Sequence, residues 1–206
     1  MKSIIILSFI LFSNLLCQID PNDYYPLHIG DKWEYFDNLD YTYFTSEVSG
    51  DTLMPNGKKY FIILGWDVRK YWRVENNKYV KTYNPYALDG EDLRYDLCSK
   101  KGTIFSFSMF DSLSGFGIYD CGIDNNNLIN AKLEWRYYCD AYILNFSVPP
   151  DTVWMMSIDV YWPRVTNGIG ITSTGVGRDE LVGAIINKVG YGTLSGSSIK
   201  ENTTSS

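Results

Sequence analysis

The 206-residue sequence lacks the residue combinations that most often carry catalysis or hold a cofactor. It has one histidine, His28, and no C-x-x-C or C-x-x-x-C pair, so zinc sites are missing their usual ligands. No phosphate-binding G-x-x-x-x-G-K-[ST] loop and no G-x-S-x-G nucleophile elbow occurs. We therefore expect a protein with no metal ion, no cofactor and no catalytic residue, which is not an enzyme.

Long apolar runs and basic clusters are also scarce. Beyond residue 17 no apolar stretch approaches the roughly 20 residues that a membrane-spanning helix needs, which predicts no transmembrane span. Acidic residues outnumber basic ones by 24 to 18, and the basic residues are scattered. Because nucleic acids and anionic membranes favour a basic stripe, we expect neither as a partner.

The first 17 residues have the composition of a signal peptide. Lys2 provides a positive start, and residues 4–16 form an apolar run that is too short to span a membrane comfortably. Cleavage between Cys17 and Gln18 predicts a secreted or cell-surface protein. The alternative is a lipoprotein anchored through an acylated Cys17, although the bulky Leu16 replaces the small residue that lipidation normally requires.

Three cysteines follow the predicted cleavage site, in a compartment that permits disulfides. Because the number is odd, one thiol has no partner within the chain. Cys121 and Cys139 flank a polar loop and a strand pattern that is compatible with a hairpin, which predicts a disulfide between them and leaves Cys98 free. The alternative is that all three are small buried apolar residues.

The rest of the chain is typical of strands and turns. Aromatic residues make up 16% of the sequence, with 17 tyrosines among them, and this bias favours half-buried pleated surfaces. Large and polar side chains alternate over residues 39–50, and MPNG at 54–57 predicts a turn before the next apolar run. A second hairpin is predicted over residues 70–84 around Asn76-Asn77, and KKG at 100–102 predicts a turn within residues 92–110.

Further strand-like runs cover residues 133–148, 151–162 and 180–192, and the segment 151–162 also fits a short helix. The glycine-rich stretch 168–177 is interpreted as a loop or a bulged edge strand. We expect a mainly β fold with little helix, an antiparallel meander curled into a half-barrel, barrel or sandwich. This single domain spans residues 18–194, and the Ser/Thr-rich residues 195–206 form a disordered tail or linker.

The stretch YYPLHIGDKWEY, residues 24–35, opens the domain. Pro26 suits the entry to a strand, and the Gly-Asp pair that follows predicts a turn, so KWEYF is expected to be the first strand. The two-residue period of a strand places Trp33 and Tyr35 on one face. His28 has no second histidine with which to share a metal ion, so we expect a structural role for it.

This opening, with its proline, Gly-Asp turn and tryptophan, resembles the start of uncharacterised secreted domains from bacteria that use type IX secretion. YWRV at Tyr71 and LRYDLCSKKGTIF at Leu93 resemble strand motifs of that family, and GIGI at Gly168 and LVGAIINKVGYGT at Leu181 resemble its closing elements. The resemblance covers most of residues 24–193 and implies a β-rich secreted domain. That family has no established activity or catalytic residue, so the resemblance implies none here.

Two functions from different classes stay open. The first is a secreted or cell-surface non-catalytic module that binds an extracellular protein or a glycan through exposed aromatic rings. The second is a periplasmic or envelope carrier that encloses an apolar ligand such as a lipid within its curved sheet. A dry cavity lined by residues such as Phe61, Ile63, Phe105 and Trp154 would indicate the carrier, whereas a filled core with an exposed aromatic strip would indicate the module.

Overall fold

The computed structural model describes residues 25–65, 69–76, 78–107, 114–126, 131–144, 151–155, 163–174 and 179–195. The predicted signal peptide, residues 1–17, lies outside these residues, and so does the predicted tail apart from Ser195. The described part of the chain contains strands, turns and short connections. It contains no helix, and so none that is long and apolar enough to cross a membrane.

Fourteen strands account for the regular structure of the described residues, which confirms the mainly β fold predicted from the sequence. The first seven are β1 (Lys32–Asp37), β2 (Thr42–Leu53), β3 (Lys59–Leu64), β4 (Lys70–Glu75), β5 (Tyr79–Tyr83), β6 (Glu91–Asp96) and β7 (Ile104–Phe107). The last seven are β8 (Ser114–Asn126), β9 (Ala131–Leu144), β10 (Asp151–Met155), β11 (Arg164–Thr166), β12 (Gly170–Ser173), β13 (Asp179–Ile186) and β14 (Val189–Gly192). Residues 151–155, where the sequence also fits a short helix, are the strand β10.

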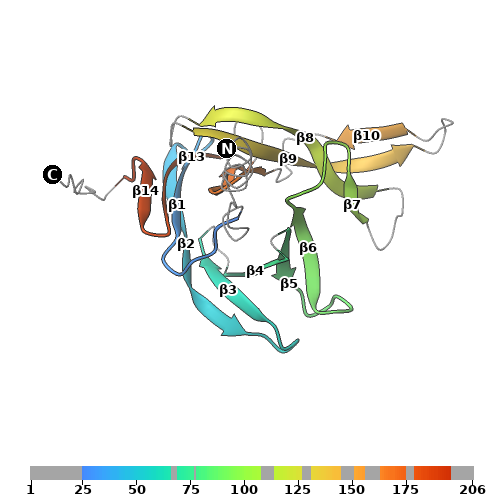
Figure 1. Cartoon of the computed structure of the whole chain (residues 1–206), viewed down its shortest axis with the longest axis horizontal. Helices are drawn as coiled ribbons and strands as arrows, with labels where there is room; N and C mark the ends of the chain where they lie inside the picture. Colours follow the sequence, from blue (N-terminus) through green and yellow to red (C-terminus); the bar gives the residue numbers. More distant parts are fainter. Residues whose placement is uncertain are drawn as a thin grey trace, which may run out of the picture.

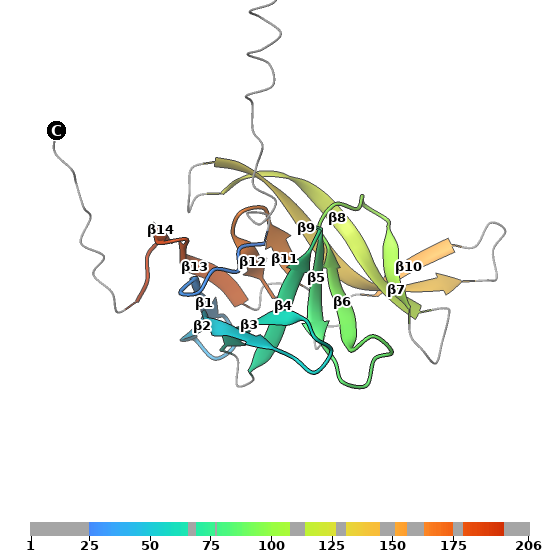
Figure 2. The ribbon, with the colours of Figure 1, turned by 60° about the horizontal axis from the view of Figure 1, so that its bottom comes forward.

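All of these strands belong to one antiparallel sheet, in the order β6-β5-β4-β3-β2-β1-β13-β12-β11-β9-β8-β7. Outside this path, β10 pairs with β9 and β14 pairs with β13. The sheet curls around an interior, with β8 and β9 on one side of it and β3 and β4 on the other (Figure 1). Figure 2 shows β4, β5 and β6 side by side, with β8 and β9 arching over them. The end strands β6 and β7 do not pair, so the sheet is not closed into a barrel.

The first strand has the orientation that its alternation predicts. Trp33 and Tyr35 share a face and are 4% and 3% exposed. Inside the sheet, the indole N–H of Trp33 donates to the main-chain oxygen of Ile169 at 2.6 Å, and the Tyr35 hydroxyl donates to that of Ile171 at 2.8 Å. Both large side chains are therefore buried with their polar atoms satisfied, which is the condition under which Trp and Tyr stabilise a core.

The two predicted hairpins are present. β2 pairs with β3 beyond a turn in which Gly57 has a φ of 75°, and β4 pairs with β5 beyond Asn76, whose φ is 50°. Glycine and asparagine tolerate this left-handed region better than other residues. The strands expected around KKG at 100–102 are also present as β6 and β7, but they do not pair with each other. The meander breaks at this connection, and its two strands become the two edges of the sheet.

Aromatic side chains fill the interior. Tyr25 contacts Trp72 and Tyr95 with ring centroids 5.7 and 6.1 Å apart, and Tyr95 contacts Tyr138 at 4.9 Å. Each of these four side chains is at most 5% exposed. The space lined by Tyr25, Ile63, Trp72 and their neighbours has a volume of about 20 Å³, which is room for roughly one water molecule. This part of the interior is therefore filled by side chains and contains no cavity large enough for a ligand.

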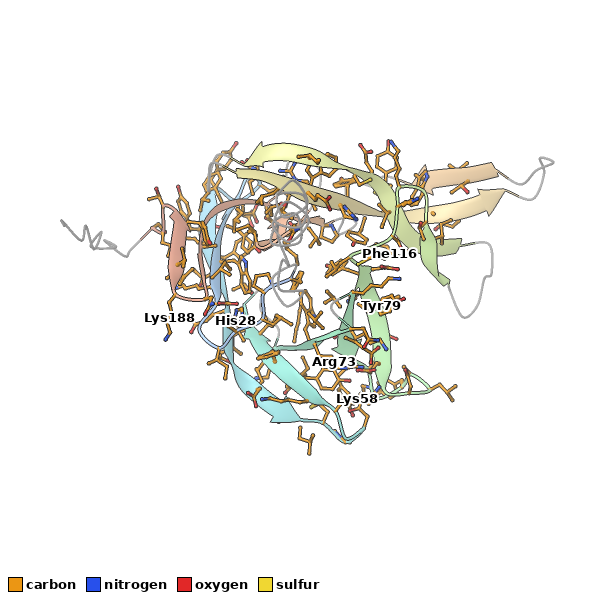
Figure 3. The ribbon with its side chains drawn as sticks, in the orientation of Figure 1. His28, Lys58, Arg73, Tyr79, Phe116 and Lys188 are labelled. Atoms are coloured by element: carbon orange, nitrogen blue, oxygen red, sulfur yellow. The ribbon has the colours of Figure 1, made fainter. Side chains whose placement is uncertain are left out.

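Side chains bridge the open side of the sheet. The hydroxyl of Tyr138 on β9 donates a hydrogen bond of 2.9 Å to the main-chain oxygen of Asp96 at the end of β6. Phe116 on β8 stacks on Tyr138 with ring centroids 5.9 Å apart and points into the enclosed space (Figure 3). The β6 end of the sheet is thus held to β8 and β9 by side chains, without a ladder of main-chain hydrogen bonds.

A buried carboxylate joins β3, β4 and β6 on the face opposite Trp72. Glu91 is 6% exposed and accepts hydrogen bonds from the Tyr60 hydroxyl, the Arg73 guanidinium and the Lys58 ammonium. Figure 3 shows Lys58 and Arg73 converging near the start of β6. Burial disfavours the ionised form of Glu91, but the hydrogen bonds from Arg73, Lys58 and Tyr60 outweigh it and hold the pKa of this carboxyl well below its usual range.

The disulfide predicted between Cys121 and Cys139 does not form, and both thiols are free, as is that of Cys98. The two cysteines do lie on paired strands, as the predicted hairpin requires. However, Cys121 lies opposite Arg136, whereas Cys139 lies opposite Gly117. Because side chains alternate along β9, Arg136 and Cys139 point to opposite faces of the sheet, and so do the two thiols. A disulfide needs Cβ atoms about 3.5–4.5 Å apart, which this register excludes.

Candidate binding site

Four aromatic side chains from three strands gather on the face of the sheet that is turned away from the core. We call them the aromatic strip, and they are Tyr119 of β8, Trp135 and Tyr137 of β9, and Trp154 of β10. Tyr138 points into the core. Because side chains alternate along β9, Trp135 and Tyr137 point to the opposite face. Tyr119 contacts Tyr137 and Trp154 edge-on, with ring centroids 6.0 and 5.8 Å apart. All four rings are half-buried.

Small side chains lie beneath the middle of the strip. β9 runs between β8 and β10, so the contact of Trp154 with Tyr119 crosses it. Ala141, which lies directly opposite Trp154, and Cys139 on the same face are both fully buried. Burial, together with the nearby Asp140 carboxylate, raises the pKa of the Cys139 thiol to about 12. Cys139 therefore acts here as a small apolar residue that leaves room for the larger rings to cross the strand.

A cation extends the strip at its Trp135 end. The guanidinium carbon of Arg164 on β11 lies 5.8 Å from the centre of the Trp135 ring, and Arg164 is directly opposite Tyr137 in the register. The Nε of Arg164 is buried and has no hydrogen-bond partner in the described part of the chain. Burial raises the pKa of Tyr137 to about 12, so its hydroxyl stays protonated near neutral pH. The Tyr137 hydroxyl therefore keeps its proton as a hydrogen-bond donor on this face.

The strip is long enough for an extended ligand. From Trp135 to Ala141, the residue opposite Trp154, β9 advances six residues, or about 20 Å at roughly 3.4 Å per residue. Half-buried rings offer flat apolar surface, and the Tyr hydroxyls and Arg164 offer hydrogen bonds beside it. This combination suits a ligand with apolar faces and polar edges.

A pocket with a volume of about 330 Å³ lies between the β13–β14 turn, the β11–β12 turn and the start of β9. Its polar lining is formed by His28, Asn167, Asn187 and Tyr191. Within the described residues the imidazole Nε2, the two side-chain amides and the phenol hydroxyl have no hydrogen-bond partner. The apolar lining is formed by Pro26, Leu133, Ile169, Ile186 and Val189. Both its volume and its mixture of apolar walls with a few polar groups are typical of small-molecule sites, which run from about 300 to 1,000 Å³.

One buried carboxylate positions the wall of this pocket. Asp31 is 1% exposed, and its Oδ2 accepts a hydrogen bond of 2.8 Å from the main-chain N–H of His28 and lies 3.1 Å from His28 Nδ1. Its Oδ1 accepts a hydrogen bond of 2.7 Å from the main-chain N–H of Asn187. Asn187 belongs to the β13–β14 hairpin, and Figure 3 shows His28 beside this hairpin, which has Lys188 at its tip. His28 thus helps to build the turn before β1, and the use of its Nδ1 leaves Nε2 free.

The described side chains among the residues singled out from the sequence lie on different faces of the sheet. Phe61 lies opposite Trp72 on the core face and packs against the core, and Ile63 belongs to the same core. Trp154 belongs to the aromatic strip on the other face. Phe105 is part of β7, and its side chain lies outside the described part of the structure. Trp154 is therefore the member of this predicted set that the structure places in the candidate site.

Sequence reasoning did not single out Trp135, Tyr137 or Tyr119. In LEWRYYCDA large aromatic residues occupy both parities of the strand, so the alternation does not tell which face is the core. The charged residues Glu134 and Arg136 share the parity of the buried Tyr138, so charge does not mark the outer face either.

No group of three His, Cys, Asp or Glu side chains among the described residues is placed to hold a metal ion. The described residues of the site offer aromatic rings, hydrogen-bonding groups and a defined shape to a ligand. Comparisons add nothing to this description of the site, because no family model matches the chain and no curated protein or solved structure is significantly similar to it.

Proposed function

We propose that this protein is a secreted or cell-surface non-catalytic module that binds a glycan along the aromatic strip. The observation that carries this proposal is the alignment of Tyr119, Trp135, Tyr137 and Trp154 on the outer face of the sheet, while a separate set of rings fills the core. The secreted location rests on the predicted signal peptide at residues 1–17 and on the resemblance to secreted domains of bacteria that use type IX secretion.

The chemistry of the strip favours a glycan over an apolar ligand. Sugar rings have flat C–H faces that pack on aromatic rings, and equatorial hydroxyls that hydrogen-bond at the edges of those rings. Tyr and Trp provide this contact area with few rotatable bonds, so little conformational entropy is lost on binding. The guanidinium group of Arg164 beside Trp135 and the Tyr137 hydroxyl provide donors next to the rings. The formal net charge of −6 disfavours strongly anionic polymers, which makes a neutral glycan the better match.

The filled interior supports the module rather than the lipid carrier. A carrier needs a cavity of several hundred Å³ inside its curved sheet. The space lined by Tyr25 and Trp72 measures about 20 Å³, and ring contacts with Trp72 and Tyr95 hold Tyr25 in place. Opening such a cavity would require several buried rings to leave the core together.

Binding to glycans tests the proposal directly. The mature chain is screened by isothermal titration against soluble β-glucan, xylan, mannan, hydroxyethyl cellulose and glycol chitin. We expect at least one of these polymers to bind, and Trp135→Ala and Trp154→Ala each to weaken that binding about tenfold, a loss of about 1.4 kcal/mol.

Tyr43→Ala is the matched control, because Tyr43 is a 56% exposed aromatic residue on β2, away from the strip. It should bind as the wild type does, and thermal melts check that every variant is folded. The proposal fails if no polymer binds, or if Tyr43→Ala weakens binding as much as the two strip variants do. Co-purification of a lipid with the wild-type protein would favour the carrier instead.

A further inference from the structure

The pocket beside the β13–β14 turn lies at one end of the aromatic strip. On β9, Leu133 lines the pocket and Trp135 belongs to the strip, and the two residues share a face about 7 Å apart along the strand. The antiparallel strand β11 also extends from the strip to the pocket, because Arg164 and Thr166 lie opposite Tyr137 and Trp135 and lead to the turn that carries Asn167. Two paired strands therefore connect the strip to the pocket.

The lining of the pocket fits an uncharged ligand that carries several hydroxyl groups. None of the described residues that line it is Lys, Arg, Asp or Glu. The side-chain amides of Asn167 and Asn187 each supply both donors and an acceptor, and the Tyr191 hydroxyl supplies one of each. Nδ1 of His28 lies 3.1 Å from the Asp31 carboxylate, so Nε2 is the ring nitrogen that is left to hydrogen-bond a ligand. Hydroxyl groups satisfy all of these partners because they donate and accept.

The pocket is also too small for a continuing polymer. Its volume of about 330 Å³ matches a single small ring with room for solvent, and its apolar walls, such as Ile169 and Ile186, suit the C–H face of such a ring. The wall is built before any ligand arrives, because the buried Asp31 fixes both the His28 turn and the main chain at Asn187. A preorganised pocket loses little entropy on binding.

We propose that this pocket holds the terminal sugar unit of the glycan whose inner units lie on the aromatic strip. The inference deepens the proposed function and rests on it for the class of ligand. The protein then recognises the ends of glycan chains. Short oligosaccharides bind to both the pocket and the strip, whereas the interior of a long polymer binds to the strip alone.

The test compares short and long forms of the same glycan. Isothermal titration is carried out with cellotetraose, xylotetraose, mannotetraose and chitotetraose, and with the corresponding soluble polymers. Asn187→Gly removes one amide from the pocket and keeps a residue that accepts the φ of 48° at this position. Asn167→Ala removes the second amide. We expect each variant to weaken binding of the bound tetraose about tenfold and to change polymer binding less than about twofold.

Trp135→Ala is the matched strip variant, and it should weaken both forms. The inference is overturned, with the proposed function intact, if the two pocket variants bind the tetraose as the wild type does while Trp135→Ala does not. If the wild type binds no probe, both proposals fall. Methyl NMR gives an independent readout, because the tetraose should shift the signals of Ile169 and Ile186, and unchanged signals in a bound complex would contradict the pocket assignment.

Discussion

The hydroxyl of Tyr138 donates a hydrogen bond to the main-chain oxygen of Asp96, and this contact joins β9 to β6, two strands that are not neighbours in the sheet. The rings of Tyr138 and Tyr95 meet beside it. An open sheet of this size exposes the edges of its end strands, which in other proteins must be covered or shortened. Here the buried Tyr138 holds the edge strand β6 against β9 on the other side of the curled sheet.

Removal of that hydroxyl should therefore weaken the whole domain. Tyr138→Phe keeps the ring contacts but leaves the Asp96 oxygen without this donor, and we expect a loss of about 1–2 kcal/mol in the free energy of unfolding. Urea denaturation measures it as a lower midpoint with an unchanged slope. Tyr142→Phe, on the same strand but 40% exposed, should change stability by less than about 0.5 kcal/mol. Equal effects of the two variants would show that the bridge contributes nothing.

Glu91 should make stability depend on acid pH. Its pKa is held below the usual value of about 4.3, so its ion pairs stabilise the folded state above about pH 5, and this contribution is lost as the pH falls. Glu91→Gln should cost about 3 kcal/mol at pH 7, because it leaves Arg73 and Lys58 without their buried partner. Its stability should also fall less than that of the wild type between pH 6 and pH 3.

The control for this experiment is Glu180→Gln, since Glu180 is an exposed carboxylate on β13. Urea unfolding at a series of pH values should give a wild-type-like curve for it. Parallel curves for Glu91→Gln and the wild type would contradict the role assigned to Glu91.

The three thiols should differ sharply in reactivity. Cys98 is exposed, whereas Cys139 is fully buried and its pKa is raised to about 12, so very little reactive thiolate forms there. Iodoacetamide at pH 8 followed by peptide mass spectrometry should find Cys98 modified first and Cys139 only after denaturation. A peptide in which Cys121 is cross-linked to Cys139 would contradict the β8–β9 register.

Gly117 should not tolerate a side chain. A Cβ at this position would lie 2.2 Å from the main-chain oxygen of Thr103, and main-chain atoms have little freedom to move away. We expect Gly117→Ala to destabilise the protein by more than about 2 kcal/mol in thermal or urea unfolding. Gly50→Ala is the matched control on β2, because nothing lies within 4 Å of its added Cβ. Unchanged stability of the Gly117→Ala variant would contradict the close approach of Thr103, the residue before β7, to Gly117.

Strands and tight turns are predictable from this sequence because their signals are local. The two-residue period of KWEYF places Trp33 and Tyr35 in the core, and Asn76 and Gly57 mark their turns through conformations that other residues avoid. The β13–β14 turn is not predictable from such local signals, because Lys188, with a φ of 69°, occupies a position where glycine is usual.

Pairings between distant strands are not predictable in this way. The glycine-rich segment that suggests a loop or an edge contains β12, which lies between β11 and β13. Gly170 permits this because its φ of 89° is one that residues with a side chain rarely adopt. The aromatic strip is not predictable for the same reason. Tyr119 and Trp154 come into contact only because β8, β9 and β10 pair with one another.

The pairing of β1 with β13 also determines when the domain is able to fold. Lys32 lies opposite Ile185, so the strand that opens the domain obtains its second neighbour only near the end of the chain. Contacts this far apart in sequence make folding slow, on the order of milliseconds to seconds for β proteins. Until β13 is available, the edge of β1 stays unpaired, so the sheet is completed only after the eleven strands from β2 to β12 have been synthesised.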